Sequence, residues 1–178
     1  NHSTDHTDEV VANFKNKRIK YLKVNNNGVI AISRNAGIKV AKGEWIAFLD
    51  SDDWWTRDKL EICINNIDDK VDFIYHDLEI KSIKPRIFGR KKIKSRKLKK
   101  PVLIDLLVEG NAISNSSVIV RKKFLDEING IDESKELVAA EDYNTWLRIA
   151  KLTDQFVYLP KRLGYYLIHD QSVSKKDM

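Results

Sequence analysis

WIAFLDSDDWW, residues 45–55, places a short apolar run directly before three carboxylates in four positions. The run from Trp45 to Leu49 has the continuous apolar character of a buried strand. Asp50 and Asp52 lie two positions apart, so in extended backbone their side chains share one face. In open α/β sheets, ligands bind beyond the carboxyl ends of the strands. The stretch predicts either a solvated acidic turn or a cation site at a strand end, and spacing alone favours neither.

Asp50 and Asp52 have the chemistry that Mg²⁺ or Mn²⁺ requires. These hard cations prefer oxygen ligands and are commonly held by one or two carboxylates together with substrate phosphates. An EF-hand loop is excluded, because Trp55 occupies the position that needs glycine. Asp53 has a simpler interpretation, as an acid at the turn that caps the helix expected from Arg57.

The charge of the chain is concentrated in one segment. The 178 residues carry a net charge of +6, but residues 81–100 contain eleven Lys and Arg and no acid, so the remainder carries −5. We expect a single domain over residues 1–178 with a basic insertion or loop at 81–100. The ordinary role of such a run is a solvated surface, and its functional role would be contact with phosphate groups.

The remaining bulk features point to a cytoplasmic protein. No apolar run approaches the roughly 20 residues of a membrane span. The opening NHSTDHTDEV is polar and unlike a signal peptide. The single Cys63 excludes an intramolecular disulfide and fits a reducing compartment. The basic segment adds the expectation of peripheral attachment at the inner membrane face, and nucleic acid is an unlikely partner.

Hydrophobic periodicity predicts alternating strands and helices in the first half of the chain. Strands are expected at residues 18–24, 44–49, 71–80, 116–120, 155–159 and 164–169. Helices are expected at residues 5–14, 29–41, 57–67, 102–109, 122–128 and 139–152. This alternation predicts an α/β fold with a largely parallel sheet.

NNNGVIAISRNAGIKVAKGEWIAFLDSDDWWTRDKLE, residues 25–61, resembles the central segment of family-2 glycosyltransferases. It contains a Ser-Arg-Asn triplet, a Gly-Glu-aromatic turn and a D-x-D-type motif in the family's order. AEDYNTWLRIAKL resembles the family's Glu-Asp helix, and YYLIHDQSVS resembles its Tyr-x-x-His-x-x-Ser ending. The resemblance covers nearly the whole chain and implies a GT-A (Rossmann-like) domain, with a mostly parallel central sheet flanked by helices.

On the donor side, the resemblance implies that Asp52 is a metal ligand and that Asp50 contacts the metal or the donor ribose. It places Arg34 and Ser51 near the nucleotide-diphosphate sugar, although a surface arginine is an equally good interpretation of Arg34. It places Asn1 at the nucleotide base and His169 near the diphosphate or metal, although a lone histidine near the chain end is more often structural.

On the acceptor side, the resemblance implies that Asp142 is the general base, which takes the proton of the attacking hydroxyl in an inverting displacement. Glu141 and Trp54 would hold the acceptor sugar, and residues 111–117 would lie on the same side. Without the resemblance, Glu141 and Asp142 are first-turn acids that the helix dipole favours. Burial in the core is the simpler account of Trp54.

Two departures from the family pattern stand out. The family's opening strand–helix–strand is missing from the sequence, and Asn1 and His2 replace its usual Asp-Gly. We therefore expect an inverting, Mn²⁺- or Mg²⁺-dependent transferase acting on a glycan or lipid-linked acceptor in surface polysaccharide synthesis. The alternative is a catalytically incomplete GT-A-like module that binds an anionic partner through residues 81–100. A nucleotidyltransferase is a third candidate, whose usual Gly-rich basic loop is not visible.

Overall fold

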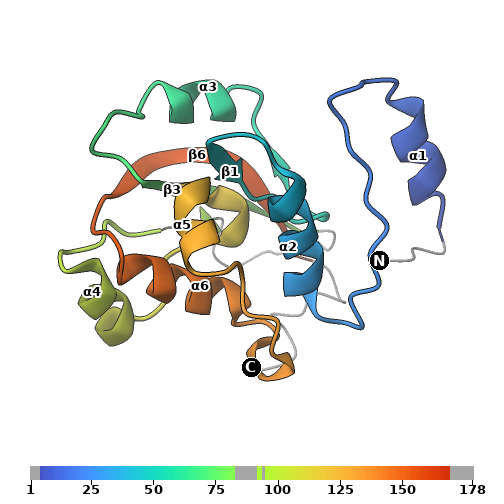
Figure 1. Ribbon diagram of the computed structural model, residues 1–178. Coiled ribbons are helices and arrows are strands. Elements are labelled where there is room, and N and C mark those ends of the chain that lie inside the picture. Colours follow the sequence, from blue (N-terminus) through green and yellow to red (C-terminus); the bar gives the residue numbers. More distant parts are fainter. Residues whose placement is uncertain (1–4, 83–91, 94, 169–178) are drawn as a thin grey trace.

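A computed structural model describes residues 5–82, 92–93 and 95–168 (Figure 1). The helices are α1 (Thr7–Asn13), α2 (Ile30–Val40), α3 (Lys59–Ile64), α4 (Val102–Glu109), α5 (Lys122–Glu127) and α6 (Glu141–Ala150), with the 3₁₀ turns η1 (Asn115–Ser117) and η2 (Lys135–Leu137). The strands are β1 (Trp45–Ala47), β2 (Trp54–Trp55), β3 (Phe73–Ser82), β4 (Lys92–Ile93), β5 (Ile119–Arg121) and β6 (Phe156–Ile168). Every expected helix is confirmed, with ends that differ by a few residues.

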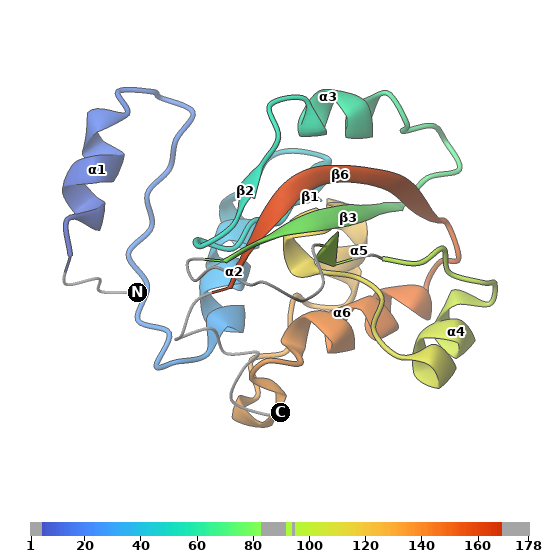
Figure 2. The ribbon, with the colours of Figure 1, turned by 180° about the vertical axis from the view of Figure 1, so that it is seen from behind.

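A curled mixed sheet forms the middle layer of the molecule, with α3 over one face and α5 and α6 over the other (Figure 2). The strand order is β1-β5-β3-β6-β2, and β4 pairs with β3. Alternate residues of β3 face the two layers: Phe73 and Tyr75 pack with Trp146 of α6, whereas Ile74 packs with Cys63 of α3. The α/β class expected from the sequence is confirmed.

The prediction of a mostly parallel sheet was wrong. Of the strand pairings in the described ranges, only β3–β6 is parallel, and β1–β5, β5–β3, β3–β4 and β2–β6 are antiparallel. The alternation of strands and helices along the chain is real, but β1 and β3 are separated in the sheet by β5, which runs opposite to both. The periodicity of side chains reports which residues are buried and carries no information about strand direction.

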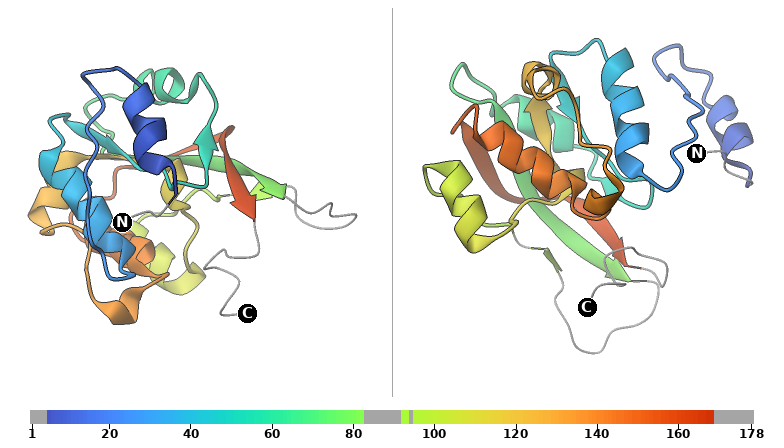
Figure 3. Two further views of the ribbon diagram at one scale, coloured as in Figure 1. Left: turned by 90° about the vertical axis from the view of Figure 1, so that its right-hand side faces the viewer. Right: turned by 60° about the horizontal axis from the view of Figure 1, so that its bottom comes forward.

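Four of the predicted strands also need correction. The strand expected at 116–120 begins only at Ile119, since Asn115–Ser117 form the 3₁₀ turn η1. Residues 18–24 alternate in polarity but form no strand, because no described strand lies beside them to complete their backbone hydrogen bonds, and their side chains are mostly exposed. The segments 155–159 and 164–169 are one continuous strand, β6, which follows β3 through register shifts near Asp77. Helix α1 has no buried residue and stands at the edge of the molecule, with the segment that leads to α2 lying between the two helices (Figures 1 and 3).

Candidate functional site

The carboxylates after β1 form a tight turn instead of continuing as extended chain. The Asp53 amide donates to the Asp50 carbonyl over 3.1 Å, and the Asp50 amide donates to the Ser116 hydroxyl over 3.0 Å. The expectation that Asp50 and Asp52 share a face of extended backbone was therefore wrong. Asp50 turns inward and is half-buried, whereas Asp52 and Ser51 are exposed at the tip of the turn.

Asp53 has a structural role that differs from the one expected. Its carboxylate accepts a hydrogen bond of 3.0 Å from the Leu167 amide of β6 and is buried there. Burial raises the pKa of Asp53 above its ordinary value, and the hydrogen bonds oppose the change. Helix α3 begins after Asp58, so Asp53 does not cap it. Asp53 instead fixes the acidic turn to the sheet.

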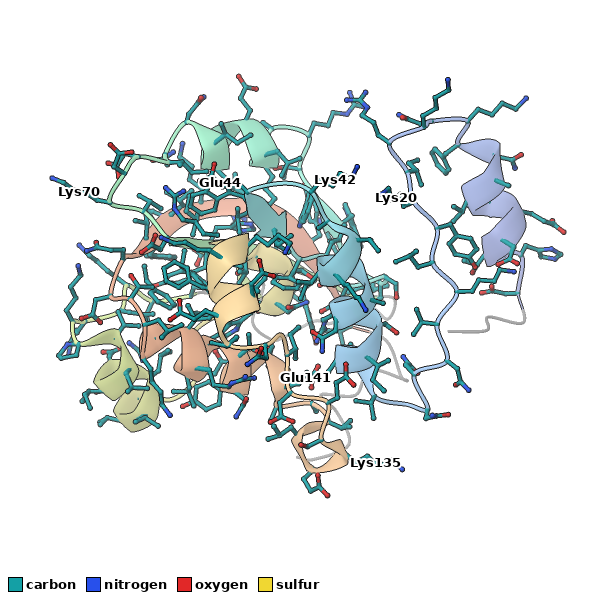
Figure 4. The ribbon with its side chains drawn as sticks, viewed as in Figure 1. Lys20, Lys42, Glu44, Lys70, Lys135 and Glu141 are labelled. Carbon is teal, nitrogen blue, oxygen red and sulfur yellow. The ribbon has the colours of Figure 1, made fainter. Side chains whose placement is uncertain are left out.

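Arg34 joins two carboxylates that are far apart in the sequence. Its Nη2 donates to Asp50 Oδ1 over 2.6 Å, and its Nη1 donates to Glu141 Oε1 over 2.7 Å. The side chain of Arg34 is 13% exposed and that of Glu141 is 9% exposed, so the surface interpretation of Arg34 is wrong. Glu141 is the first residue of α6, and its side chain lies on the side of that helix that faces α2 (Figure 4). The Arg34 guanidinium therefore holds the acidic turn against the start of α6.

Residues around η1 complete the support of the turn. Asn115 Nδ2 donates to Asp50 Oδ1 over 2.8 Å, so that oxygen already accepts two hydrogen bonds. Trp55 Nε1 donates to the Ser116 carbonyl over 2.8 Å. The buried Lys59 ammonium lies 3.6 Å from the centre of the Trp55 ring. Residues 111–117, expected on the acceptor side, thus contact Asp50 directly through Asn115. Lys59 packs on Trp55 from the α3 side of the turn.

Asp142 has the electrostatic character of a base that works near neutral pH. Burial raises the pKa of Asp142 to about 6, the Tyr143 amide hydrogen bond lowers it, and the negative charge of Glu141 raises it. The Tyr143 amide donates to Asp142 Oδ1 over 2.6 Å, which orients the carboxyl group. A general base is most effective when its pKa lies close to the working pH.

Two buried oxygens at the start of α6 lack a partner among the described residues: Glu141 Oε2 and Asn144 Oδ1. Both are hydrogen-bond acceptors, so sugar hydroxyl groups would satisfy them. Unsatisfied buried acceptors are costly, which makes this corner a candidate ligand site. Asn144 was missed in the sequence, although its position three residues after Glu141 places both side chains on one side of the helix.

A cavity of about 310 Å³ lies beside Arg34, lined by Gly37 and Ile38 of α2, by Ala41 just after that helix and by residues 45–49. It runs along the outer edge of β1, where the described part of the sheet ends. Arg34 thus borders the cavity as well as binding the two carboxylates. The volume lies at the lower end of the range for small-molecule sites.

The acidic turn fits a cation that shares its ligands with a substrate. Within residues 5–82, 92–93 and 95–168, no three His, Cys, Asp or Glu side chains cluster in a metal-binding arrangement. A closed protein cage for a metal is therefore absent from the described ranges. Mg²⁺ and Mn²⁺ commonly take only one or two carboxylates and complete their shell with phosphate oxygens and water. Asp52, exposed at the tip of the turn, suits that arrangement, and Asp50 keeps a second carboxylate oxygen that is not used by Arg34 or Asn115.

The other predicted site residues are less closely connected to this cluster. Trp54 is 41% exposed on β2 and stacks on Tyr165, with ring centroids 5.1 Å apart. Burial in the core, the simpler account of Trp54, is therefore wrong, whereas Trp146 is fully buried. Asn1 and His169 lie outside the described residues, so their predicted roles at the base and the diphosphate stay predictions.

Comparison with known proteins identifies relatives of this chain. The model of "Glycosyl transferase family 2" matches residues 1–128. The UDP-Glc:alpha-D-GlcNAc-diphosphoundecaprenol beta-1,3-glucosyltransferase WfgD of Escherichia coli is 34% identical over 153 residues, covering 84% of this chain and 55% of the relative. The enzyme WfaP of the same description and organism is 29% identical over 175 residues, covering 97% of this chain and 64% of the relative. This chain therefore spans just over half to about two thirds of their length.

Among solved structures, the chain is similar to S. aureus TarS 1-349 in complex with UDP-GlcNAc. The TM-score is 0.69 at 24% sequence identity, and the match covers 96% of this chain and 48% of TarS 1-349. At that identity the likeness concerns the fold, and it agrees with the α/β architecture described above.

Proposed function

Because the chain belongs to glycosyl transferase family 2, we propose that it serves an inverting transfer of a sugar from a nucleotide-diphosphate donor to a hydroxyl of a glycan or lipid-linked acceptor. One observation carries the proposal. Arg34 brings the acidic turn at Asp50 and the Glu141–Asp142 pair into one cluster, although these segments are about ninety residues apart in the chain. A cation-binding turn and a base near neutral pH are the two parts that this reaction needs.

The chemical step is a single displacement. The acceptor hydroxyl donates a hydrogen bond to the Asp142 carboxylate, and its oxygen attacks the anomeric carbon of the donor sugar. As the new C–O bond forms, the bond from that carbon to the diphosphate oxygen breaks, and the hydroxyl proton passes to Asp142. The diphosphate leaves with the electron pair of the broken bond. Attack opposite the leaving group inverts the anomeric centre.

The donor side must accommodate negative charge on the departing diphosphate. Asp52 and Asp50 would hold Mn²⁺ or Mg²⁺, which when bound supplies Lewis-acid neutralisation of that charge. Asp50 keeps the orientation of its carboxylate through Arg34 and Asn115. Asp52 is exposed at the tip of the turn, whereas Asp50 is half-buried and bound to Arg34 and Asn115. We therefore assign the main ligand role to Asp52 and a shared role to Asp50.

The acceptor side is formed by Glu141, Asn144 and Asp142 at the start of α6. The unsatisfied oxygens of Glu141 and Asn144 would accept hydroxyl hydrogen bonds and thereby orient the sugar toward the base, Asp142. The relatives WfgD and WfaP are named for transfer from UDP-Glc to GlcNAc-diphosphoundecaprenol. We therefore propose a UDP-sugar donor and a lipid-linked acceptor at the cytoplasmic membrane face. None of the helices in the described ranges has the length and apolar character needed to cross a bilayer.

The decisive experiment measures donor binding and turnover separately in the full-length protein. Calorimetry with UDP and Mn²⁺ should show binding that Asp52→Ala weakens at least tenfold, whereas Asp69→Asn, a change at an exposed acid outside the site, leaves binding unchanged. Transfer from a UDP-sugar to a synthetic lipid-diphosphate acceptor should be lost in Asp142→Asn while UDP binding persists. Failure of every nucleotide diphosphate to bind with metal would overturn the proposal. Salt-sensitive binding to an anionic polymer as the sole activity would favour the incomplete module instead.

A further inference from the structure

Helix α4 presents an apolar face to solvent. Ile104, Leu107 and Val108 are 53%, 58% and 73% exposed, and their i, i+3, i+4 spacing places them on one side of the helix. The opposite side is buried through Val102 and Leu106. A helix that is apolar on both sides requires a second partner in addition to the core. Adjacent exposed apolar side chains of this kind commonly mark an interaction surface.

Exposed lysines occur in the two segments that adjoin α4. Lys97, Lys99 and Lys100 are exposed in the segment that leads directly into α4, and Lys151 is exposed where α6 ends beside it. The two segments are joined, since the Val102 amide donates to Asp154 Oδ1 over 2.7 Å. Helices α4 and α6 lie side by side in every view (Figures 1 to 3).

Acidic side chains near the face do not cancel these cations. Asp105 is buried in an ion pair with Arg96, which leaves Glu109 as the exposed acid of α4. Asp154, which accepts the Val102 amide, is a second acid at this face, and the four lysines outnumber the two acids Glu109 and Asp154, so the net charge around the apolar face is positive. An apolar strip bordered by lysines matches the interfacial region of an anionic bilayer, where acyl chains receive the apolar side chains and lipid phosphates attract the cations.

We propose that Ile104, Leu107 and Val108, together with Lys97, Lys99, Lys100 and Lys151, form a docking surface for an anionic lipid bilayer. We call these residues the α4 surface. The occupant is the bilayer itself, because the lysines complement lipid phosphates while the three aliphatic side chains are too few for a stable protein interface. The inference rests on the proposed function in one respect, that a lipid-linked acceptor would bring the substrate to the same membrane.

Hydrogen bonds connect the α4 surface to the candidate site. Tyr143, the neighbour of Asp142, donates its hydroxyl to the Leu106 carbonyl of α4 over 2.6 Å. Arg96 Nη2 donates to the Gly110 carbonyl at the end of α4 over 3.3 Å. The chain then continues to Asn115, which binds Asp50. Docking of α4 would therefore hold both the base and the acidic turn at a defined position relative to the membrane.

Co-sedimentation with lipid vesicles tests this inference without any substrate. The full chain is mixed with vesicles of phosphatidylcholine alone or with phosphatidylglycerol, at low and high salt. We expect binding to the anionic vesicles that salt weakens. Lys97→Gln/Lys99→Gln should weaken it roughly twenty-five-fold, from about fivefold for each lysine near an anionic surface. Leu107→Gln/Val108→Gln should weaken it about tenfold or more, since both side chains lose apolar burial.

Control variants remove lysines or an apolar side chain from parts of the surface outside the α4 surface. Lys39→Gln/Lys42→Gln removes two exposed lysines around the end of α2, and Ile64→Gln removes a side chain that is 61% exposed on α3. Both should bind anionic vesicles within twofold of the parent protein. Equal losses in the control and α4 variants, or no vesicle binding at all, would overturn the docking surface. Binding to duplex DNA or to a protein in preference to vesicles would do the same.

The outcome separates docking from the proposed function. UDP binding with Mn²⁺ in vesicle-free solution should be the same in the α4 variants as in the parent, because none of the substituted side chains contacts the acidic turn. Loss of vesicle binding with intact nucleotide binding removes the bilayer as a partner and leaves the transferase proposal standing. Vesicle binding without any nucleotide binding keeps the bilayer as a partner and removes the transferase proposal.

Discussion

Replacing Arg34 with methionine tests whether the cluster depends on one guanidinium. The substitution keeps the aliphatic part of the side chain and removes both charged hydrogen bonds. Glu141 is 9% exposed and loses its partner at Oε1, while Oε2 already lacks one in the described structure. Removal of one member of a buried ion pair typically costs about 3–5 kcal/mol. Asp50 is one-third exposed and keeps Asn115, so we expect the lower end, about 3 kcal/mol.

Urea unfolding and thermal melting of Arg34→Met measure this loss. For a domain of this size, about 3 kcal/mol lowers Tm by roughly 6–12 °C. The double variant Arg34→Met/Glu141→Gln removes the unpaired charge and should recover about 2 kcal/mol relative to Arg34→Met. Together with the single variant Glu141→Gln, it gives the coupling energy between the two residues. Arg34→Met should also raise the pKa of Asp142, because the Arg34 charge lowers it in the parent protein. The acidic limb of the transfer rate should then move to higher pH.

Two results would refute this reasoning. Arg34→Met with an unfolding free energy within about 0.5 kcal/mol of the parent would mean that water replaces the guanidinium. A double variant as unstable as Arg34→Met would mean that the loss does not come from the charge of Glu141. Arg18→Met, at an exposed arginine outside the sheet, is the matched control and should leave the unfolding free energy unchanged.

The other predictions concern the base, a buried lysine and a loop glycine. The transfer rate should rise with pH through about 6 as Asp142 loses its proton, and Asp142→Asn should lower it by about 10²–10⁴-fold; a tenfold loss or less would remove Asp142 as the base. Burial lowers the pKa of Lys59 to about 7, so between pH 7 and 10 the unfolded chain binds the proton that the folded one lacks, and stability should rise with pH. In urea unfolding, the free energy of unfolding of Lys59→Met should no longer rise with pH in this range, and it should exceed that of the parent by on the order of 4 kcal/mol at pH 7. An unchanged dependence on pH would contradict the lowered pKa of Lys59. Gly130→Ala should destabilise the protein by about 2–4 kcal/mol, because φ is +78° and a Cβ would lie 2.7 Å from Asn35 Oδ1; calorimetry showing a smaller change than Gly37→Ala would contradict it.

Much of the candidate site was predictable because its residues occur in short local patterns. The acidic turn follows an apolar run, and Glu141 and Asp142 open an amphipathic helix, so both could be recognised within a dozen residues of sequence. The resemblance to a known family assigned them to one site. Asn144 and Lys59 had no such signal, since an amide on a helix and a lysine near an acidic turn are ordinary features of a protein surface. Their burial depends on segments elsewhere in the chain.

The sequence by itself determined the α/β class, the positions of most helices and strands, and the carboxylates available for chemistry. Side-chain periodicity and turn residues act over a few neighbouring positions, so they can be read without knowing the rest of the chain. Only the tertiary structure decided that β5 runs antiparallel between β1 and β3, that Asp53 binds β6 and that Arg34 joins Asp50 to Glu141. These contacts link segments tens of residues apart, and they form because packing of the core places particular polar groups where water is excluded and a protein partner must replace it.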